Sequence, residues 1–410
     1  MKKIVVFGTF DTKGAEYAYL IDCLKETFSG EIVTLDIAGM PYDPPFKPHI
    51  SNVQVAQRAG HSAQDLRDAD RLGGVEIMIS GLKLVLGDLL SRGEMDGVIS
   101  LGGGAGTIMA LEAMKTLPVG FPKLLVSTIA TSAKVGQYIE GNDIIVMNSI
   151  VDIAGLNKIS RRVFRIAAGA IAGAVEGNRP GDEGTPARPT IAATMFGNTT
   201  LGVNAAKDWL EAKGYEVLVF HANGGGGRTM EALIRNGLIT GVLDLTTTEW
   251  ADNVCEGSVC KGGPDRLSAA AQCGVPQVVA PGALDQANYA DRQSIPDRYA
   301  HRTVYGEGRS CLMRTDVAEN EEMGRHMAEK LNQCVAPCVF MFPQLGYSKL
   351  DIQGGPFYGP EENRAFHDSL LANLDNAKVT VREFKLHIND MAFGVAAAEQ
   401  LHQLILAAKQ

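Results

Sequence analysis

The chain has 410 residues, more than one ordinary hydrophobic core accommodates, so its length predicts two domains. The formal net charge of −9 argues against a broad nucleic-acid surface, which needs a stripe of basic side chains, but not against one small phosphate ligand. Seven cysteines are scattered along the chain, and no export signal or membrane-spanning apolar run is apparent, so we expect a cytoplasmic protein with reduced thiols.

The first half alternates short apolar runs with segments of helical periodicity. Short apolar runs are typical of buried parallel strands, and apolar residues spaced three or four positions apart are typical of helices. The predicted strands cover 3–7, 32–37, 98–101, 123–127 and 143–147. The predicted helices lie at 15–28, within 51–93, from 108 onward and at 158–175.

A polar stretch rich in glycine and proline separates the two halves and predicts a linker at 178–189. The pattern then starts again, with predicted strands at 190–195, 216–220, 241–245, 277–280 and 339–342. The sequence therefore predicts a nucleotide-binding N-terminal subdomain over 1–177 and a second subdomain over 190–390. We expect the closing helix, 391–410, to pack back on the first subdomain.

The two halves are similar in sequence pattern, since GVISL corresponds to GVLDL and EIVTLDI to EVLVFHA. Alternating strands and helices predict the α/β class, with mainly parallel sheets covered by helices on both faces. Ligands of such sheets bind beyond the carboxyl ends of the strands. The expected site is therefore a cleft between the subdomains, where one or both sets of strand ends converge.

A run of glycines lies between a predicted strand and a predicted helix, in DGVISLGGGAGTIMALEAM. Glycine permits a sharp bend and the close approach of a ligand, and the free N–H groups at a helix N-terminus attract phosphate. The alternative is a tight connection without a ligand. Because similar turns recur along the chain, we predict an anion site formed by Gly102, Gly103, Gly104, Ala105, Gly106 and Thr107.

The turn after the first strand, GTFDTK, carries the groups that a nucleoside triphosphate requires. Hydroxyls can contact phosphate oxygens, a carboxylate can hold Mg²⁺, and a lysine can offset negative charge. No GxxxxGK[ST] or GxGxxG motif occurs at this turn. The alternative is a helix cap at Asp11 and a solvated Lys13. With a second glycine-rich turn in the same half, we favour ligand binding by Gly8, Thr9, Phe10, Asp11, Thr12 and Lys13.

In the second half, FHANGGGGRT follows a strand and opens a helix, which indicates a second anion cradle. The predicted substrate-binding residues are Asn223, Gly224, Gly225, Gly226, Gly227, Arg228 and Thr229. The catalytic candidates at strand ends are His221, Asp244 and Glu249. The alternatives are a flexible loop, a strand-end histidine and helix caps, and capping is also expected of Asp285.

The cysteines predict no metal site. Cys255, Cys260 and Cys273 lack zinc spacing, because four residues separate the first pair and no CxxC partner follows. Buried or half-exposed thiols are expected instead.

Several long strings together resemble a known family. GTFDTKGAEYAYL, VISLGGGAGT, LLVSTIAT, FHANGGGGRTMEALI, GVLDLTTTEWAD and GGPDRLSAA are similar to the bacterial and plant family of the ATP-binding N-terminal domain of the tomato mosaic virus resistance protein. The resemblance covers essentially the whole chain. It implies two Rossmann-like subdomains, ATP bound in the N-terminal one, and dimer formation. We therefore expect a homodimer or higher homo-oligomer with ATP as cofactor, and the residues of the first turn add Mg²⁺ as an optional companion. Carried over to this chain, the ATP-binding turns are 8–13, 102–107 and a third turn of Thr128, Ile129 and Ala130.

Three functional hypotheses follow. The first is an ATP-binding enzyme that acts on a small metabolite in the cleft, and the second is a regulatory module in which ATP stabilises a dimer or partner-binding form without turnover. The third is an enzyme that acts on a sugar acid without a nucleotide. Polar strand ends in the second half favour an enzyme, whereas the lack of a kinase or ATPase motif favours the module. No nucleic-acid or membrane partner is expected.

Overall fold

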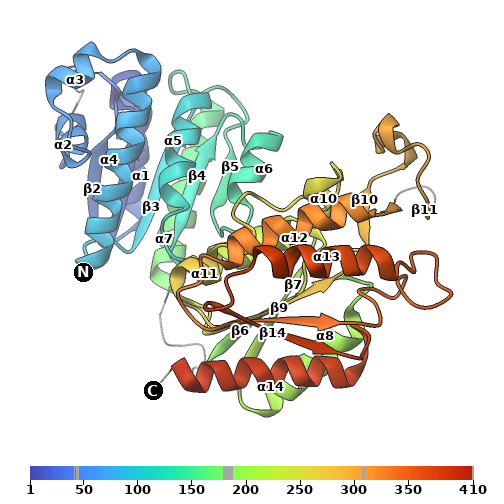
Figure 1. Ribbon diagram of the computed structural model, residues 1–410. Helices are drawn as coiled ribbons and strands as arrows, with labels where there is room; N and C mark the ends of the chain where they lie inside the picture. The colour runs from blue at the N-terminus through green and yellow to red at the C-terminus, as the bar shows by residue number, and fades with distance from the viewer. Residues whose placement is uncertain (41, 43–45, 179–187, 307–309, 409–410) are drawn as a thin grey trace. The chain divides into compact units, whose positions relative to one another are not determined.

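The computed structural model describes residues 1–40, 42, 46–178, 188–306 and 310–408 (Figure 1). The chain forms two compact units, Met1–Thr185 and Pro186–Gln410, and each has its own main sheet. Most of the predicted linker, 179–187, lies outside the described residues. The predicted α/β class with mainly parallel sheets is confirmed.

A five-stranded parallel sheet in the order β2-β1-β3-β4-β5 forms the centre of the first unit. Its strands are β1 (Lys3–Gly8), β2 (Glu31–Asp36), β3 (Gly97–Gly102), β4 (Lys123–Ser127) and β5 (Ile145–Asn148). The chain order reverses between β1 and β3, where Phe7 pairs with Ser100. The loops that follow these two strands therefore flank the switch point at which doubly wound sheets bind ligands.

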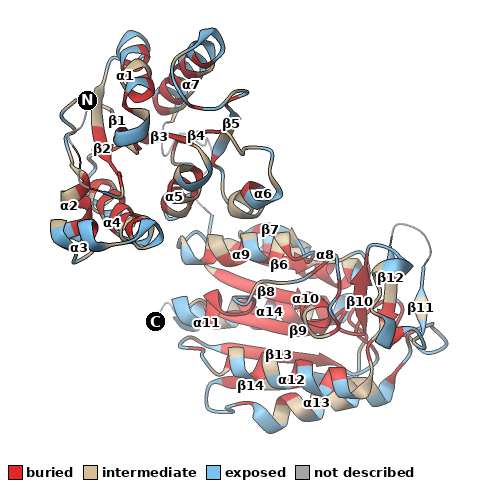
Figure 2. Cartoon of the chain, turned by 90° about the horizontal axis from the view of Figure 1, so that it is seen from above, coloured by how far each residue is buried: buried red, intermediate tan, exposed pale blue. Residues whose placement is uncertain are grey.

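Helices cover both faces of this sheet (Figure 2). Alternate residues of β1 point to opposite faces, so Val5 belongs to one core and Ile4 to the other. The core around Ile4 lies under α1 (Phe10–Thr27) and α7 (Lys158–Gly177). The core around Val5 lies under α2 (Asn52–Arg58), α3 (Ala63–Asp68), α4 (Arg71–Ser91), α5 (Gly104–Met114) and α6 (Ala133–Ile139).

The first helix begins at Phe10 rather than at the predicted Ala15. The Phe10 side chain is fully buried, and its ring centroid lies 4.9 Å from that of Tyr17 and 4.8 Å from that of Phe46. Burial of this ring brings the next two residues into the first helical turn, and the backbone irregularity falls at Lys13, with φ −132°. Most of the predicted GTFDTK turn is therefore the start of a helix.

The main sheet of the second unit repeats this topology. Its six parallel strands follow the order β14-β13-β9-β8-β6-β7, with the reversal between β6 and β8. They are β6 (Thr190–Met195), β7 (Glu216–His221), β8 (Gly241–Thr246), β9 (Gln277–Gly282), β13 (Cys338–Pro343) and β14 (Val379–Phe384). A small antiparallel sheet that the sequence analysis does not predict consists of β10 (Gln286–Tyr289), β11 (Val304–Tyr305) and β12 (Cys311–Arg314).

Two helices cover one face of the six-stranded sheet, namely α8 (Thr200–Ala212) and α14 (Met391–Ala408). The opposite face carries α9 (Gly225–Arg235), α10 (Glu249–Val254), α11 (Ala269–Cys273), α12 (Val317–Leu331) and α13 (Pro360–Asn373), and two short 3₁₀ turns lie at Arg292–Ser294 and Asp297–Tyr299. The expectation that the closing helix packs on the first subdomain is corrected. Phe393, Ala397 and Leu401, spaced four residues apart, lie in the core of the second unit.

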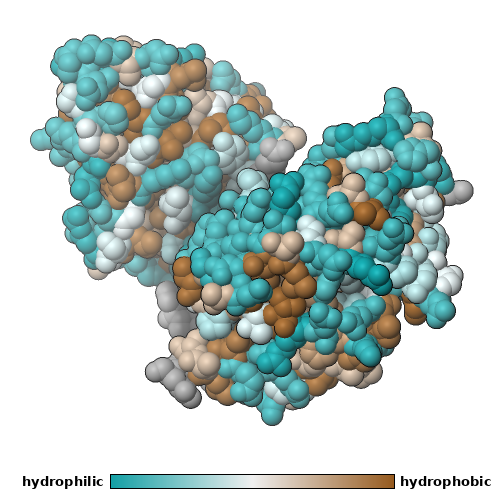
Figure 3. Space-filling view, in the orientation of Figure 1, coloured by the Kyte–Doolittle hydropathy of each residue, from teal (hydrophilic) through white to brown (hydrophobic). Residues whose placement is uncertain are grey.

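On the face drawn in Figure 3, hydrophilic side chains predominate and apolar side chains form separate groups. Scattered apolar surface residues are common in globular proteins. Within the described ranges, no helix combines the length and apolar character that crossing a bilayer requires.

Two glycines in α4 provide a matched test of helix packing. A Cβ atom on Gly81 would overlap the Val55 backbone oxygen in α2, whereas a Cβ atom on Gly87 would meet nothing within 4 Å. Gly81→Ala should therefore lower the unfolding free energy by about 1–3 kcal/mol through overpacking. Gly87→Ala should raise it by about 0.5–1 kcal/mol, because alanine favours the helix. Urea denaturation measures both changes, and equal effects would contradict the close α2–α4 contact.

Candidate functional site

Two of the predicted ligand turns lie side by side in the first unit, after β1 and β3. A Cβ atom on Gly103 would lie 3.9 Å from the Cε atom of Lys13, so the lysine stem passes the glycine-rich turn. The third predicted turn adjoins them, because the Thr128 N–H donates to the Gly102 carbonyl at 3.0 Å. The structure therefore brings together three segments that are distant in sequence.

The N-terminus of α5 is open at this edge. Gly103 is its N-cap residue, and no side chain caps the helix. Gly104 and Ala105 are exposed, and a Cβ atom on Gly104 would meet nothing within 4 Å. The first N–H groups of an α-helix have no intrahelical acceptor, so here they are directed out of the helix beside Lys13. This combination of backbone donors and an ammonium group suits an anion.

Thr107 and Gly102 shape the turn from inside the protein. A Cβ atom on Gly102 would lie 2.5 Å from the Thr107 nitrogen, so only glycine fits there. The buried Thr107 hydroxyl donates to the Gly102 carbonyl at 3.2 Å and hydrogen-bonds the Ser127 hydroxyl at 2.7 Å. Thr107, predicted as a ligand residue, therefore directs its side chain inward and ties the turn to β4.

Asp36, at the end of β2, orders the start of α1. Its carboxylate accepts the N–H groups of Phe10 at 3.3 Å and Ala38 at 3.0 Å, and burial raises its pKa above the ordinary value. Lys13 is oriented by a hydrogen bond from its Nζ to the Ile153 carbonyl at 2.5 Å. Asp11 is exposed and accepts the Thr12 N–H at 2.7 Å. Asp11 is thus the carboxylate of these turns that faces solvent.

A buried arginine organises the strand ends of the second unit. The Arg266 side chain is 1% exposed, and its guanidinium forms two hydrogen bonds to Asp244, one of them at 2.7 Å. Its Nε lies 3.2 Å from Glu249, and its Nη1 lies 3.8 Å from Glu231 in α9. The structure therefore places the predicted Asp244 and Glu249 together, around a cation that sequence reasoning missed. The only signal was its place in the string GGPDRLSAA.

Three carboxylates surround one guanidinium, so the cluster holds excess acidic groups. Burial raises the pKa of Glu249 from its ordinary 4.5 to about 7, and Asp244 adds to this rise while Arg266 opposes it. Burial also raises the pKa of Glu231. Within the described residues, neither carboxylate oxygen of Glu249 has a hydrogen-bond partner. Burial therefore favours the protonated form of Glu249 in this cluster.

The glycine-rich cradle lies against this cluster. A Cβ atom on Gly227 would overlap a Glu249 oxygen, so glycine lets α9 approach the carboxylate. Gly224 has φ +81°, a backbone conformation that glycine adopts easily. Asn223 accepts the Gly226 N–H at 3.0 Å, so part of the cradle is already satisfied within the loop. The Arg228 guanidinium donates a hydrogen bond to the Lys261 carbonyl at 2.8 Å, and the Thr229 hydroxyl donates one to the Gly225 carbonyl at 2.9 Å.

His221 is set apart from the two predicted catalytic carboxylates. Its side chain is exposed at the end of β7 and stacks on Phe196, with ring centroids 5.1 Å apart. Over the described residues, no hydrogen bond or ion pair joins this ring to Asp244 or Glu249. The catalytic roles of the three residues stay predictions.

Asp285 does not cap a helix, contrary to the expectation from sequence. Its buried carboxylate accepts a hydrogen bond from the Ser348 hydroxyl at 2.8 Å, and burial, together with the nearby Asp351, raises its pKa to about 7.

The adjoining strand β10 fills the switch point of the second sheet. Gln286 accepts from Asn198 at 2.9 Å, and Asn288 donates to Thr248 at 3.2 Å and to Asp252 at 2.8 Å.

Both units match one family. Residues 2–180 match the N-terminal domain of the Uncharacterised protein family (UPF0261), and residues 188–405 match its C-terminal domain. The chain belongs to this family. The matched ranges contain both sets of strand-end turns described above.

Relatives of the chain occur in bacteria and in a plant. A UPF0261 protein of Clostridium tetani is 42% identical over 402 residues, which are 98% of each chain. One of Rhizobium meliloti is 40% identical over 400 residues, 97% of this chain and 98% of that protein. The ToMV resistance protein Tm-1(GCR237) of Solanum lycopersicum is 33% identical over 425 residues, 98% of this chain and 56% of the tomato protein. The resemblance to the tomato family is therefore confirmed.

Replacement of Arg266 tests the buried cluster. Arg266→Met leaves three buried carboxyl groups without their cation and should lower the unfolding free energy by about 3–5 kcal/mol. The matched control is Arg235→Met, which removes an exposed pair with Asp265 (3.6 Å) and should cost at most about 1 kcal/mol. Denaturant unfolding compares the two. A loss no larger than that of the control would show that the cluster does not stabilise the unit.

The ionisation of Glu249 should make the unfolding free energy depend on pH. Its pKa is about 7 in the folded chain and ordinarily 4.5, so the folded state retains a proton that the unfolded state releases in this window. Wild-type stability should therefore fall as pH rises from about 4.5 to 7. Glu249→Gln cannot ionise, so its stability relative to wild type should increase over the same range. Urea unfolding at several pH values measures the difference, and parallel pH profiles would contradict the raised pKa.

Proposed function

We propose that the chain binds ATP at the carboxyl edge of the β2-β1-β3-β4-β5 sheet, with the phosphates at the N-terminus of α5. The observation that carries the proposal is the uncapped start of α5 beside Lys13, at the switch point between β1 and β3. Helix N–H groups and an ammonium both favour a polyanion. The family resemblance implies ATP as that polyanion.

The surrounding residues support this assignment by their chemistry. The N–H groups of Gly104, Ala105 and Gly106 would contact phosphate oxygens, since the open glycines leave room for close approach. The hydroxyls of Thr9 and Thr12 lie 3.3 Å apart at the start of α1 and are further phosphate ligands. The turn Thr128–Ala130 borders the same edge and would complete the site.

The acidic groups of this edge differ in how well they suit Mg²⁺. Asp11 is exposed and fits a cation that accompanies the phosphates, directly or through water. Asp36 fits poorly, because it is buried, has a raised pKa and already accepts two N–H groups. When bound, Mg²⁺ would neutralise part of the phosphate charge. Asp11 is therefore the residue that we assign to the metal.

Two kinds of function use ATP binding. The burial of Asp244 and Glu249 around Arg266 favours a regulatory module, in which ATP stabilises one form of the chain without turnover. An enzyme that acts on a small metabolite is favoured by the exposed His221, which is open to a substrate at the end of β7. The homodimer or higher oligomer implied by the resemblance stays a prediction.

A thermal-shift titration tests the ATP site. ATP should raise the unfolding temperature, since a ligand at about 100 times its Kd stabilises the folded state by about 2.7 kcal/mol. Gly104→Val places a branched side chain in open space at the helix end, so the variant should fold normally and lose the shift. Gly87→Val, in α4 and also in open space, is the control and should keep the shift.

The same titration with ADP, AMP and NAD, with and without Mg²⁺, defines the ligand. Asp11→Ala should remove the part of the ATP shift that depends on Mg²⁺. An ATP shift that survives Gly104→Val would move the site away from α5. If no nucleotide shifts the wild type, ATP binding is rejected.

A further inference from the structure

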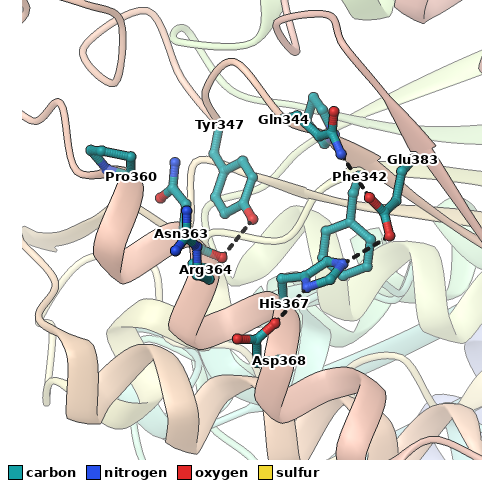
Figure 4. A pocket seen from close by; sticks show the side chains of 10 residues that line it. Phe342, Gln344, Tyr347, Pro360, Asn363, Arg364, His367, Asp368 and Glu383 are labelled. Carbon is teal, nitrogen blue, oxygen red and sulfur yellow. Dashed lines mark hydrogen bonds and ion pairs between the residues drawn. The ribbon is translucent and has the colours of Figure 1, made fainter.

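A pocket of about 340 Å³ opens at the carboxyl ends of β13 and β14 (Figure 4). Its volume lies at the lower end of the range of small-molecule sites, roughly 300–1,000 Å³. One wall is a face of α13, which presents Pro360, Arg364 and Asp368 at successive turns. The pocket therefore occupies the edge of the sheet at which α/β proteins bind ligands.

The inner wall is apolar. Phe342 and Pro343 end β13, and the rings of Tyr347 and Pro360 adjoin them. The Tyr347 hydroxyl donates to the Asn363 carbonyl at 3.1 Å, so its polar group is already satisfied. This wall therefore suits an apolar side chain of about the size of leucine or phenylalanine.

The opposite rim is polar, and several of its groups already form hydrogen bonds with one another. His367 lies between two carboxylates, with Nδ1 2.9 Å from Asp368 and Nε2 3.1 Å from Glu383. Gln344 donates to the second Glu383 oxygen at 2.6 Å, as Figure 4 shows. Both oxygens of Glu383 are thus occupied, whereas Asp368 uses one oxygen and is 66% exposed.

Arg364 and Asp368 are the groups that remain for a ligand. They stand one helical turn apart on α13, where opposite charges commonly pair. Within the described ranges, however, Arg364 has no hydrogen-bond or ion-pair partner. The rim thus offers a free guanidinium and a carboxylate oxygen next to each other, above an apolar wall.

We propose that this pocket binds an α-amino acid with an apolar side chain. The carboxylate would pair with the Arg364 guanidinium, which matches it in a bidentate manner. The ammonium would contact the outer oxygen of Asp368, and the side chain would lie against Phe342 and Tyr347. An α-amino acid carries both charges, so it can pair with the Arg364 guanidinium and the Asp368 carboxylate at once, which an acid or an amine alone cannot do.

Ligand-observed saturation-transfer NMR on the full chain tests the proposal with phenylalanine, phenylpropanoate, which lacks the ammonium, and phenethylamine, which lacks the carboxylate. Phenylalanine should bind with a Kd on the order of 1 mM or tighter. Each single-charge analogue should bind about tenfold more weakly, because it leaves one charge of the rim unpaired. Glycine should bind more weakly as well, since it has no side chain for the apolar wall.

Variants separate the two charges. Arg364→Gln should weaken the binding of phenylalanine about tenfold, so that phenylalanine binds no more tightly than phenethylamine. With Asp368→Asn, phenylalanine should bind no more tightly than phenylpropanoate. Both side chains are exposed, so the fold should persist, which the thermal unfolding midpoint checks. The control Arg71→Gln, an exposed position at the start of α4 in the first unit, should bind like wild type.

Several results would overturn the proposal. They are the absence of phenylalanine binding, equal binding of phenylalanine and its analogues, and unchanged binding in both pocket variants. Tighter binding of phenylpropanoate than of phenylalanine would assign the pocket to an organic acid instead. Gly104→Val should leave phenylalanine binding intact, so this test is independent of the ATP proposal.

Discussion

The parallel direction of the strands in both main sheets is the constraint on which the candidate sites depend. Parallel strands bring all their carboxyl ends to one edge, and each return crosses a face of the sheet as a helix. In each sheet the second strand in the chain lies on one side of the first and the third lies on the other. The connections after β1 and β3, or after β6 and β8, therefore leave toward opposite faces, and doubly wound sheets bind ligands at such a point.

The two units use this shared topology differently. In the first unit the switch point is built from backbone, because Gly103 and Gly104 leave the start of α5 uncovered. In the second unit side chains fill the corresponding place, through Asn198, Gln286 and the buried cluster around Arg266. Open backbone donors suit a phosphate ligand, whereas a filled polar core fixes the surrounding loops. The pocket of the second unit lies instead beyond the carboxyl ends of β13 and β14, which are at the far end of the strand order from the switch point.

The sequence predicts the strands well, because short apolar runs reflect a local requirement. It places the start of α5 too late, at 108, because the structure already includes Gly104 to Thr107 in that helix. It does not predict the start of α1, since the burial of Phe10 against Phe46 depends on a distant segment. The helical pattern of α14 shows that one face is buried but not which sheet covers it. The role of Arg266 is also hidden, because its partners Asp244 and Glu249 share no periodic spacing with it. The strands β10–β12 have two to four residues each, too few for an alternating pattern to be distinct.

The Arg266 cluster links the second-half turns mechanically. Glu231 comes from α9, Asp244 from β8 and Glu249 from the start of α10, so one guanidinium holds three elements together. Glu231 also accepts the N–H groups of Leu267 and Ala269, both at 2.7 Å, which attaches the segment after Arg266 to the same helix. Strand β7 ends at His221, and the turn 222–224 leads from it into α9. One end of this turn is therefore fixed by the pairing of β7 with β6, and the other by a buried ion cluster that needs no contact with a ligand.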